Sequence, residues 1–327
     1  MGRYLLKRLL NYTIMLFVAV TLVYFLAASR LNPRLLYDIT NPNLDWDSIN
    51  ASLRDKNLNP DESIWSRYFD WLGGVFRWDW GQKPKGGFVN DEIANRVWIS
   101  VRLVTGGFLI GVISGILIGA WTATRQYKIS DRTITLVSLI LLSTPTFVIA
   151  VVLQILMIKI NRAAGWHFEF IGETGIRNGP FITRMLDRLE HLILPTITLA
   201  IGPVGFAFYG RYQRNMMLDT LHADYVRTAR AKGLSRRKAI FKHALRTALI
   251  PVGTLFAFGA AGVFVGAVFT ETLFGWHGMG EYLVTSINTQ DVHGVAAVAC
   301  FTGVTVFIGA MLSEVFVVLL DPRVRVG

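Results

Sequence analysis

The chain has 327 residues, of which 52% are hydrophobic and 17% charged, and its formal net charge is +11. A mean hydropathy of +0.43 is too high for an ordinary soluble domain of this length, so a membrane protein is expected. The basic residues lie in short segments between apolar runs, where anionic lipid and membrane orientation explain them, so no nucleic-acid partner is expected. The single Cys300 excludes an intrachain disulfide.

Six stretches without Asp, Glu, Lys or Arg are long enough to cross a membrane as helices, which takes about 20 residues. They are 9–29, 103–124, 133–158, 192–210, 247–270 and 292–313. The sequence therefore predicts an all-α polytopic membrane protein with six transmembrane helices. Lys and Arg far outnumber acids in the segments that would face one side, and both termini belong to that side. By the positive-inside rule, both termini are predicted to be cytoplasmic.

The first apolar stretch follows Arg3, Lys7 and Arg8 and is longer than the apolar core of a signal peptide, so we expect it to be retained. The polar segment 30–96 combines Asn-Pro turn signals with five tryptophans. These aromatic residues allow a small packed external region that contacts a partner, or a belt at the lipid headgroups. We predict two domains: residues 1–96, the first helix plus this external region, and residues 97–327, a core of five helices.

Glycine and proline recur inside the predicted spans. Gly107, Gly111, Gly115 and Gly119 follow one another at every fourth residue, which predicts close packing against another helix, although a substrate groove is an alternative. Pro145 lies in the middle of the third span and predicts a kink, because proline removes one backbone donor. Pro195 is expected near the first turn of the fourth span, where proline is tolerated.

The most informative segment is the basic run 224–251, DYVRTARAKGLSRRKAIFKHALRTALIP, between two apolar runs. Gly233 can adopt a positive φ and end one helix, and the Ser235 hydroxyl can cap the next. The sequence predicts two short cytoplasmic helices that meet at Gly233, in a hairpin over residues 224–247. Such a charged hairpin is suited to binding by another protein.

Several motifs carry a resemblance to a known family. After Asp224, the spacing of Ala229, Ala231, Gly233 and Leu234 resembles that of the EAA loop of bacterial ABC importer permeases. The sequence DYVRTARAKGL resembles the dipeptide and oligopeptide branch of that family. The pattern Ser143-Thr-Pro145-Thr-Phe147, the run from Leu194 to Ala200 and the ending Asp321-Pro-Arg-Val-Arg also resemble family motifs. A further resemblance covers Glu271, Phe274, Gly278 and Gly280, with His277 where the family usually has proline. The resemblance spans roughly residues 95–325.

The resemblance implies a type I ABC importer permease fold and the role of a peptide-importer permease of the B type. The residues it implies for coupling to an ATPase are Asp224, Tyr225, Arg227, Thr228, Ala229, Ala231, Lys232, Gly233 and Leu234. It implies pore or kink roles for Ser143, Pro145, Phe147 and Pro195, and an external loop with Glu271, Phe274, Gly278 and Gly280. The chain would lie in a bacterial cytoplasmic membrane.

The partners that the resemblance implies are a second homologous permease subunit, two ATP-binding subunits that hold ATP and Mg²⁺, and an extracytoplasmic solute-binding protein. Permeases for nickel, glutathione or another small solute share much of this wording and stay open as alternatives. A secondary transporter would show inverted repeats or several buried charges, and neither is evident. An intramembrane enzyme would need paired acids at the midplane, where only Glu314 is available, and a simple membrane anchor would not need so many glycines and prolines.

The chain has no sequence motif of an enzyme. It contains no Gly-Lys dipeptide and therefore no P-loop for ATP, and HExxH, GxSxG and CxxC are missing. The six histidines show no ligand spacing, so no metal or cofactor is expected in this chain.

Overall fold

The computed structural model describes residues 2–37, 44–176 and 178–320, and the ending that starts at Asp321 lies outside them. No strand occurs in these ranges, which contain only an isolated bridge between Gln82 and Phe88. The predicted all-α class is confirmed for this part of the chain. Two compact units are present: Met1–Val101 with His277–Val304, and Arg102–Trp276 with Thr305–Gly327. This division differs from the domain boundary expected near residue 96, which stays a prediction.

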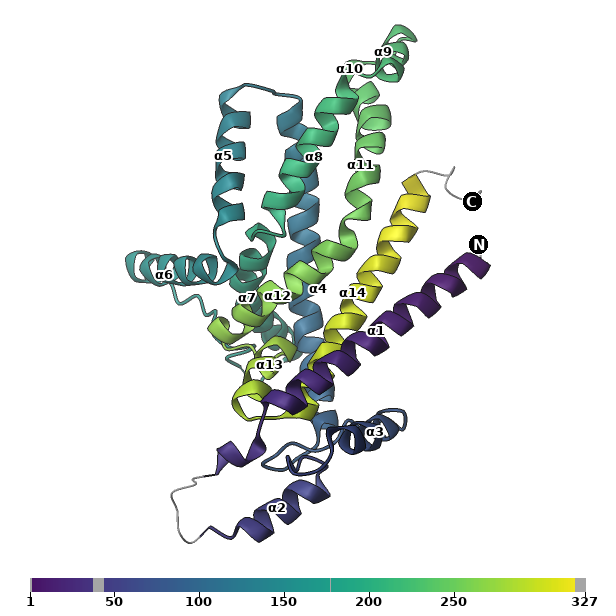
Figure 1. Cartoon of the computed structure of the whole chain (residues 1–327). Helices are drawn as coiled ribbons and strands as arrows, with labels where there is room; N and C mark the ends of the chain where they lie inside the picture. Colours follow the sequence, from purple (N-terminus) through teal and green to yellow (C-terminus); the bar gives the residue numbers. More distant parts are fainter. Residues whose placement is uncertain (1, 38–43, 177, 321–327) are drawn as a thin grey trace. The chain divides into compact units, whose positions relative to one another are not determined.

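The first unit is built from the N-terminal part of the chain and a short later segment. It holds α1 (Gly2–Arg30), the 3-10 turn η1 (Pro33–Leu36), α2 (Trp46–Asp55) and α3 (Ile64–Val75), with α13 (Met279–Asn288) and the N-terminal parts of α4 (Val89–Ala123) and α14 (Val292–Leu320) (Figure 1). Asn32 caps η1, and both Asp45 carboxylate oxygens contact the start of α2.

Aromatic residues form the core of the first unit. Tyr24 of α1 stacks on Trp71 of α3 with ring centroids 4.6 Å apart, and the Trp71 Nε1–H donates to the Trp80 carbonyl at 3.1 Å. Trp71 and Trp80 are buried, whereas Trp65 and Trp78 are more than 60% exposed. Of the two interpretations of this segment, packing therefore applies to Trp71 and Trp80, and the exposed pair stays available to lipid or a partner.

The second unit holds the remaining helices. They are the C-terminal parts of α4 and α14, α5 (Ile129–Ser143), α6 (Thr146–Ala164), α7 (Phe181–Ile201), α8 (Phe206–Leu221), α9 (Asp224–Ala231), α10 (Arg236–Ala239), the π-helical η2 (Ile240–Ala244), α11 (Leu245–Thr254) and α12 (Phe256–Phe274). The glycine stripe of α4 packs against α7 and α8. A Cβ added at Gly111 would lie 2.7 Å from the Ala200 carbonyl oxygen, and one at Gly115 would lie 2.9 Å from the Gly210 nitrogen. The stripe is thus a packing motif, as predicted.

Two of the predicted spans are divided in the structure. The stretch 133–158 was expected as one kinked helix, but it separates into α5 and α6, which run in different directions (Figure 1). Thr144 adopts an extended conformation before Pro145, as residues before proline prefer, so the helix ends there. The stretch 192–210 divides into α7 and α8, bent by 42° at residues 202–205. The Gly202-Pro-Val-Gly205 sequence accounts for this bend.

Two placements from the sequence are corrected by these boundaries. Because α7 begins at Phe181, Pro195 lies deep inside the helix and is buried, and it is not near a first turn. The stretch 247–270 is likewise shared between α11 and α12, with a turn at Leu255. Among the described residues, four helices are long and apolar enough to cross a membrane, or five when α7 and α8 count as one span. Several candidate spans are therefore present in this part of the chain, fewer than the six expected from the sequence.

Candidate functional site

The basic hairpin begins with the short helix α9, which ends at Gly233 in a Schellman motif. The Leu234 N–H donates to the Ala229 carbonyl at 3.2 Å, and the Gly233 N–H donates to the Arg230 carbonyl at 3.0 Å. Gly233 has φ +89°, the positive value expected from the sequence, and a Cβ there would meet nothing within 4 Å. The backbone conformation alone therefore explains the glycine.

The second half of the hairpin differs from the prediction of a second short helix. The Ser235 hydroxyl accepts from the Lys238 N–H at 3.4 Å, which begins α10 as expected. From Arg236 the helix then continues through η2 and α11 to Thr254 without a break. No glycine or proline interrupts residues 236–250, so nothing in this segment ends the helix. The turn η2 is π-helical, which means that its hydrogen bonds join residues five apart. The hairpin is thus one short helix joined to a long one.

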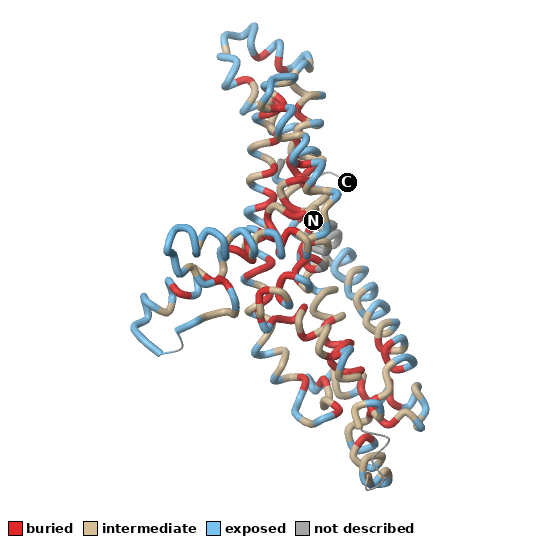
Figure 2. Tube along the Cα trace, turned by 90° about the vertical axis from the view of Figure 1, so that its left-hand side faces the viewer, coloured by how far each residue is buried: buried red, intermediate tan, exposed pale blue. Residues whose placement is uncertain are grey.

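Small apolar residues fix the hairpin to the rest of the second unit. Val226 and Ala229 of α9 pack in one buried cluster with Ala239, Met217 of α8 and Ala123 at the end of α4. Figure 2 shows this end of the chain mostly in the colour of exposed residues, with a few buried positions between them. A displacement of α9 would therefore act directly on α8 and α4.

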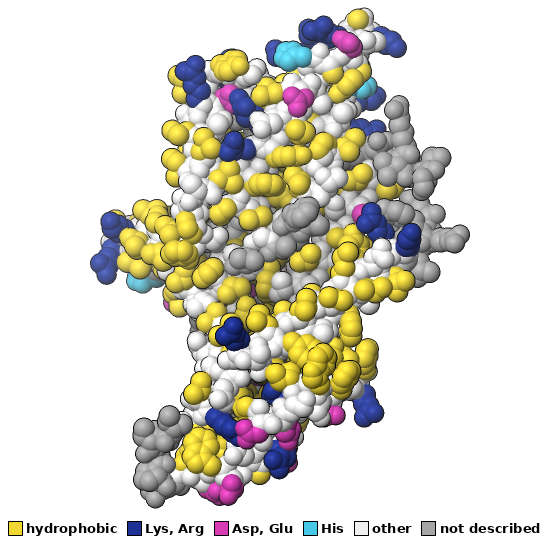
Figure 3. Space-filling view, viewed as in Figure 1, with side chains coloured by type: hydrophobic (Ala, Val, Ile, Leu, Met, Phe, Trp, Pro, Cys, Tyr) yellow, Lys and Arg dark blue, Asp and Glu magenta, His cyan; other side chains and the backbone are white. Residues whose placement is uncertain are grey.

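The outer face of the hairpin is polar and basic. Residues 224–247 contain eight Lys and Arg and a single acid, Asp224, and Figure 3 shows basic side chains gathered over α9 and α10. Of the predicted coupling residues, those exposed are Asp224, Tyr225, Arg227, Thr228, Ala231, Lys232 and Gly233. Ala229 is buried and Leu234 is half-buried, and both pack in the cluster that fixes the hairpin.

A partly buried ion pair between α5 and α8 was not singled out from the sequence. Arg214 of α8 makes two hydrogen bonds to the Asp131 carboxylate, at 2.6 and 2.8 Å, and the Tyr127 N–H donates to the same carboxylate at 3.0 Å. The hydrogen bond from Arg214 holds the pKa of Asp131 below its usual value. This pair fixes the turn 124–128 and the start of α5 to α8. The two residues are 83 positions apart in the sequence, so it is the packing of α5 against α8 that brings them together.

The four predicted external-loop residues are all buried in the structure. Glu271 and Phe274 lie at the end of α12 with no exposed surface, and Gly278 and Gly280 are buried at the start of α13. The segment is therefore a helix end, a turn and a second helix. His277, in the place where proline is usual, has an exposed side chain 3.9 Å from Glu281.

The predicted pore and kink residues differ in exposure. Ser143, Pro145 and Phe147 are exposed at the break between α5 and α6, and the Ser143 hydroxyl donates to the Leu139 and Ile140 carbonyls. Phe147 lies beside Phe269 of α12, with ring centroids 6.0 Å apart. Pro195, in contrast, is buried inside α7.

One group in the described residues has ligand atoms close enough for a metal ion, although no such spacing was expected. Oxygen or nitrogen atoms of Glu169, Asp187 and His191 all lie within 4.8 Å of one another. Asp187 and His191 are four apart on α7, a signal visible in the sequence, but Glu169 comes from the preceding loop. Asp187 already accepts hydrogen bonds from the Gly175 and Ile176 backbone, and the His191 Nδ1 lies 2.9 Å from the Asp187 carbonyl. This arrangement fixes the loop to α7.

Comparison with known proteins agrees with these features. Residues 115–326 match the model of the family described as the binding-protein-dependent transport system inner membrane component. The oligopeptide transport system permease protein OppB of Mycobacterium tuberculosis is 46% identical over the full length of both chains. Two further relatives are each 30% identical over 99% of this chain and their own full length: the oligopeptide permease AppB of Bacillus subtilis and the dipeptide permease DppB of Lactococcus lactis. The chain belongs to the family of binding-protein-dependent transport system inner membrane components.

Proposed function

We propose that this chain is a transmembrane permease subunit of an ATP-driven importer of dipeptides and oligopeptides. The observation that carries the proposal is the hairpin: a basic, exposed helix ended by Gly233 and fixed through small apolar residues to α4, α8 and α11. The family membership supports the same role, and so do the peptide-permease names of the relatives. Nickel, glutathione and other small solutes are less favoured, because these three relatives are all named for peptides.

The chain crosses the membrane six times in this proposal, with the type I importer fold. The spans are α1, α4, α5 with α6, α7 with α8, α11 with α12, and α14. Broken spans leave backbone groups without helical partners, which a membrane protein tolerates where they are buried in protein or line a water-filled path. Both termini and the hairpin face the cytoplasm, as the distribution of Lys and Arg predicts.

Import requires partners that bind ATP and deliver substrate. We infer a second homologous permease subunit, two ATPase subunits against the hairpins, and an extracytoplasmic solute-binding protein. Closure of the ATPases on ATP and Mg²⁺ would push α9, and the cluster that joins Val226 and Ala229 to α8 would transmit the push to the spans. The path then alternates between outward and inward access, in a two-state change driven by nucleotide binding.

A cross-linking experiment tests the contact with the ATPase. A cysteine placed at exposed Thr228, in a Cys300→Ala background, is labelled with a photoreactive thiol reagent in the complex purified in mild detergent. We expect a cross-link to an ATPase subunit from Thr228→Cys and none from Trp166→Cys, an exposed position on the expected outer side. A complex without any ATPase subunit, or equal cross-linking from both positions, would contradict the proposal.

A further inference from the structure

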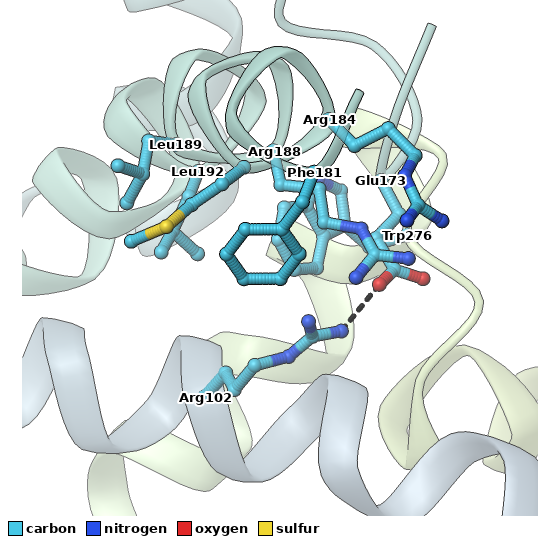
Figure 4. Close-up of a pocket in the computed structure, with 9 residues that line it drawn as sticks. Arg102, Glu173, Phe181, Arg184, Arg188, Leu189, Leu192 and Trp276 are labelled. Carbon is cyan, nitrogen blue, oxygen red and sulfur yellow. Dashed lines mark hydrogen bonds and ion pairs between the residues drawn. The ribbon is translucent and has the colours of Figure 1, made fainter. Parts of the chain in front are cut away.

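A cavity in the second unit is left unexplained by the proposed function. It has a volume of about 310 Å³ and lies between the first half of α7, Arg102 of α4, the loop residue Glu173 and Trp276. Its other lining residues, all on α7, are Phe181, Arg184, Met185, Arg188, Leu189 and Leu192 (Figure 4). A volume near 300 Å³ lies at the lower end of the range for small-ligand sites. By the expected topology, the cavity is at the extracytoplasmic end of the helices.

The cavity carries an excess of positive charge. Arg102 pairs with Glu173, whereas Arg184 and Arg188 have no acidic partner among the described residues. Figure 4 shows the three guanidinium groups turned toward the same part of the cavity, beside the Glu173 carboxylate. Arg184 and Arg188 are four apart on one helix face, where like charges repel each other. One negative group would offset this repulsion.

Two buried donors in the lining lack a hydrogen-bond partner within the described structure. They are the Nε–H of Arg184 and the indole N–H of Trp276, and Trp276 is only 2% exposed. A buried donor without an acceptor costs free energy, so such groups generally have a partner in the working state of a protein. The lining therefore offers guanidinium and indole donors to an oxyanion.

The remaining surface of the cavity selects among oxyanions. Phe181, Met185, Leu189 and Leu192 recur at helical spacing beside the two arginines, so an apolar wall adjoins the donors. An inorganic anion has no apolar group that could contact such a wall. The last residue of a peptide, in contrast, presents a carboxylate beside a side chain. Guanidinium groups bind carboxylates through two parallel hydrogen bonds.

We propose that this cavity binds the C-terminal carboxylate of a peptide, with Arg184 and Arg188 as the anion donors and the α7 residues against the last side chain. The inference rests on the proposed function, because it assigns the cavity to the substrate of the importer. It predicts that the permease distinguishes a peptide with a free C-terminus from the corresponding amide.

A protection experiment measures this preference directly. Phe181 is 72% exposed, so Phe181→Cys in a Cys300→Ala complex reconstituted in lipid vesicles should react with an impermeant maleimide. Trialanine is expected to slow the labelling and trialanine amide to slow it far less. Arg184→Gln and Arg188→Gln should each raise the half-protecting trialanine concentration by about tenfold or more, since each removes a charged hydrogen bond. Arg162→Gln, at an exposed arginine of α6 outside the cavity, should leave it unchanged.

Three results would overturn the inference: equal protection by the acid and the amide, unchanged protection in the arginine variants, or protection that follows the phosphatidylglycerol content of the vesicles and not the peptide. The last result would assign the cavity to a lipid headgroup. If Arg184→Gln prevents assembly, two other variants still test the role of the charge. Arg188→Gln changes an exposed residue, and Arg184→Lys keeps the positive charge at position 184. ATP-driven uptake in the same vesicles is scored separately. Uptake without selective protection refutes only the cavity, whereas selective protection without uptake refutes only the importer.

Discussion

Gly233 has a backbone conformation that few other residues adopt, and it sets the direction of α9 relative to the long helix that follows. Its φ of +89° completes the Schellman hydrogen bonds that end α9, and open space surrounds the position of a Cβ. A substitution there consequently strains the backbone without creating a steric clash.

Replacing Gly233 by valine is expected to uncouple ATP hydrolysis from uptake. A β-branched residue at positive φ costs about 1 kcal/mol or more, so the turn relaxes and α9 changes direction. The measurement is uptake per ATP hydrolysed in reconstituted vesicles. Gly165→Val is the matched control, since Gly165 also has positive φ (+66°) and open space but ends α6, away from the hairpin. Intact coupling in Gly233→Val would show that the hairpin is not the coupling element.

Asp291 is a second residue whose environment has a measurable consequence. It lies just before α14 and is 1% exposed, and its carboxylate accepts from the Gly294 N–H at 2.9 Å and from the Tyr282 hydroxyl at 3.3 Å. Burial raises the pKa of Asp291 to about 6, while nearby Lys83 and these hydrogen bonds oppose the shift. The folded state therefore binds the proton more tightly than the unfolded chain does.

The contribution of Asp291 to stability is expected to fall as the pH rises from about 4 to about 6. Below this window the carboxyl is protonated in both states, and above it the buried charge persists at a cost of at most about 3 kcal/mol. Thermal unfolding in detergent at pH 4, 5, 6 and 7 measures the effect. The readout is the difference between wild type and Asp291→Asn, because other carboxyls, such as Asp131, have lowered pKa values and act in the opposite direction. A difference that does not change with pH would contradict the raised pKa.

At the scale of helices, close backbone packing holds α4 to α7 and α8. The glycines of α4 face Ala200, Gly205 and Gly210 so closely that a methyl group does not fit at Gly111 or Gly115 without movement. Small residues at such contacts allow the dispersion attraction that joins helices in lipid.

Gly111→Ala is expected to destabilise the chain by roughly 1–3 kcal/mol, the usual range for overpacking. The new Cβ would lie 2.7 Å from the Ala200 carbonyl oxygen and 2.9 Å from the Gly205 Cα, and neither backbone atom can move aside alone. Gly73→Ala in α3 is the control, since nothing lies within 4 Å of its Cβ position and alanine favours a helix. Loss of thermal stability in Gly111→Ala, but not in Gly73→Ala, is the expected result. Equal stability of the two variants would rule out close packing at Gly111.

The sequence predicted elements better than it predicted their interruptions. Hydropathy located the apolar stretches, and the glycines at every fourth residue of α4 predicted close packing. Gly233 and Ser235 predicted the turn and the cap of the hairpin. The break at Pro145 was underestimated as a kink. The bend at 202–205 was missed, although Gly-Pro-Val-Gly signals it, because an average over an apolar window does not register a turn.

Contacts between distant residues were beyond the reach of sequence patterns. The Asp131–Arg214 pair, the group of Glu169 with Asp187 and His191, and the burial of Glu271 all depend on how helices fold back on one another. A count of charges along the sequence cannot show that Asp131 is 1% exposed and paired with Arg214. A sequence motif thus names site residues without showing which are packed and which are exposed. Only the structure shows that Ala229 is buried and Tyr225 exposed.

For the whole molecule, the membrane orientation proposed from the distribution of Lys and Arg is open to direct measurement. Asn288→Cys, exposed at the end of α13, should react in the Cys300→Ala background with an impermeant thiol reagent added outside intact cells. Thr228→Cys on the hairpin should react only after the cytoplasmic face is opened. The reverse pattern would invert the topology and place the hairpin where no ATPase can reach it.

The central claim is that this chain is one half of a translocation path and obtains its energy from partners. Its sequence contains no P-loop, the element that holds the phosphates and Mg²⁺ in a defined geometry in P-loop ATPases. The most direct measurement is peptide uptake and ATP hydrolysis by the purified chain in lipid vesicles, compared with vesicles that also contain the second permease, the two ATPases and the solute-binding protein. The permease-subunit assignment predicts neither activity for the chain alone and both for the complete complex. Robust ATP-dependent uptake by the isolated chain would contradict it.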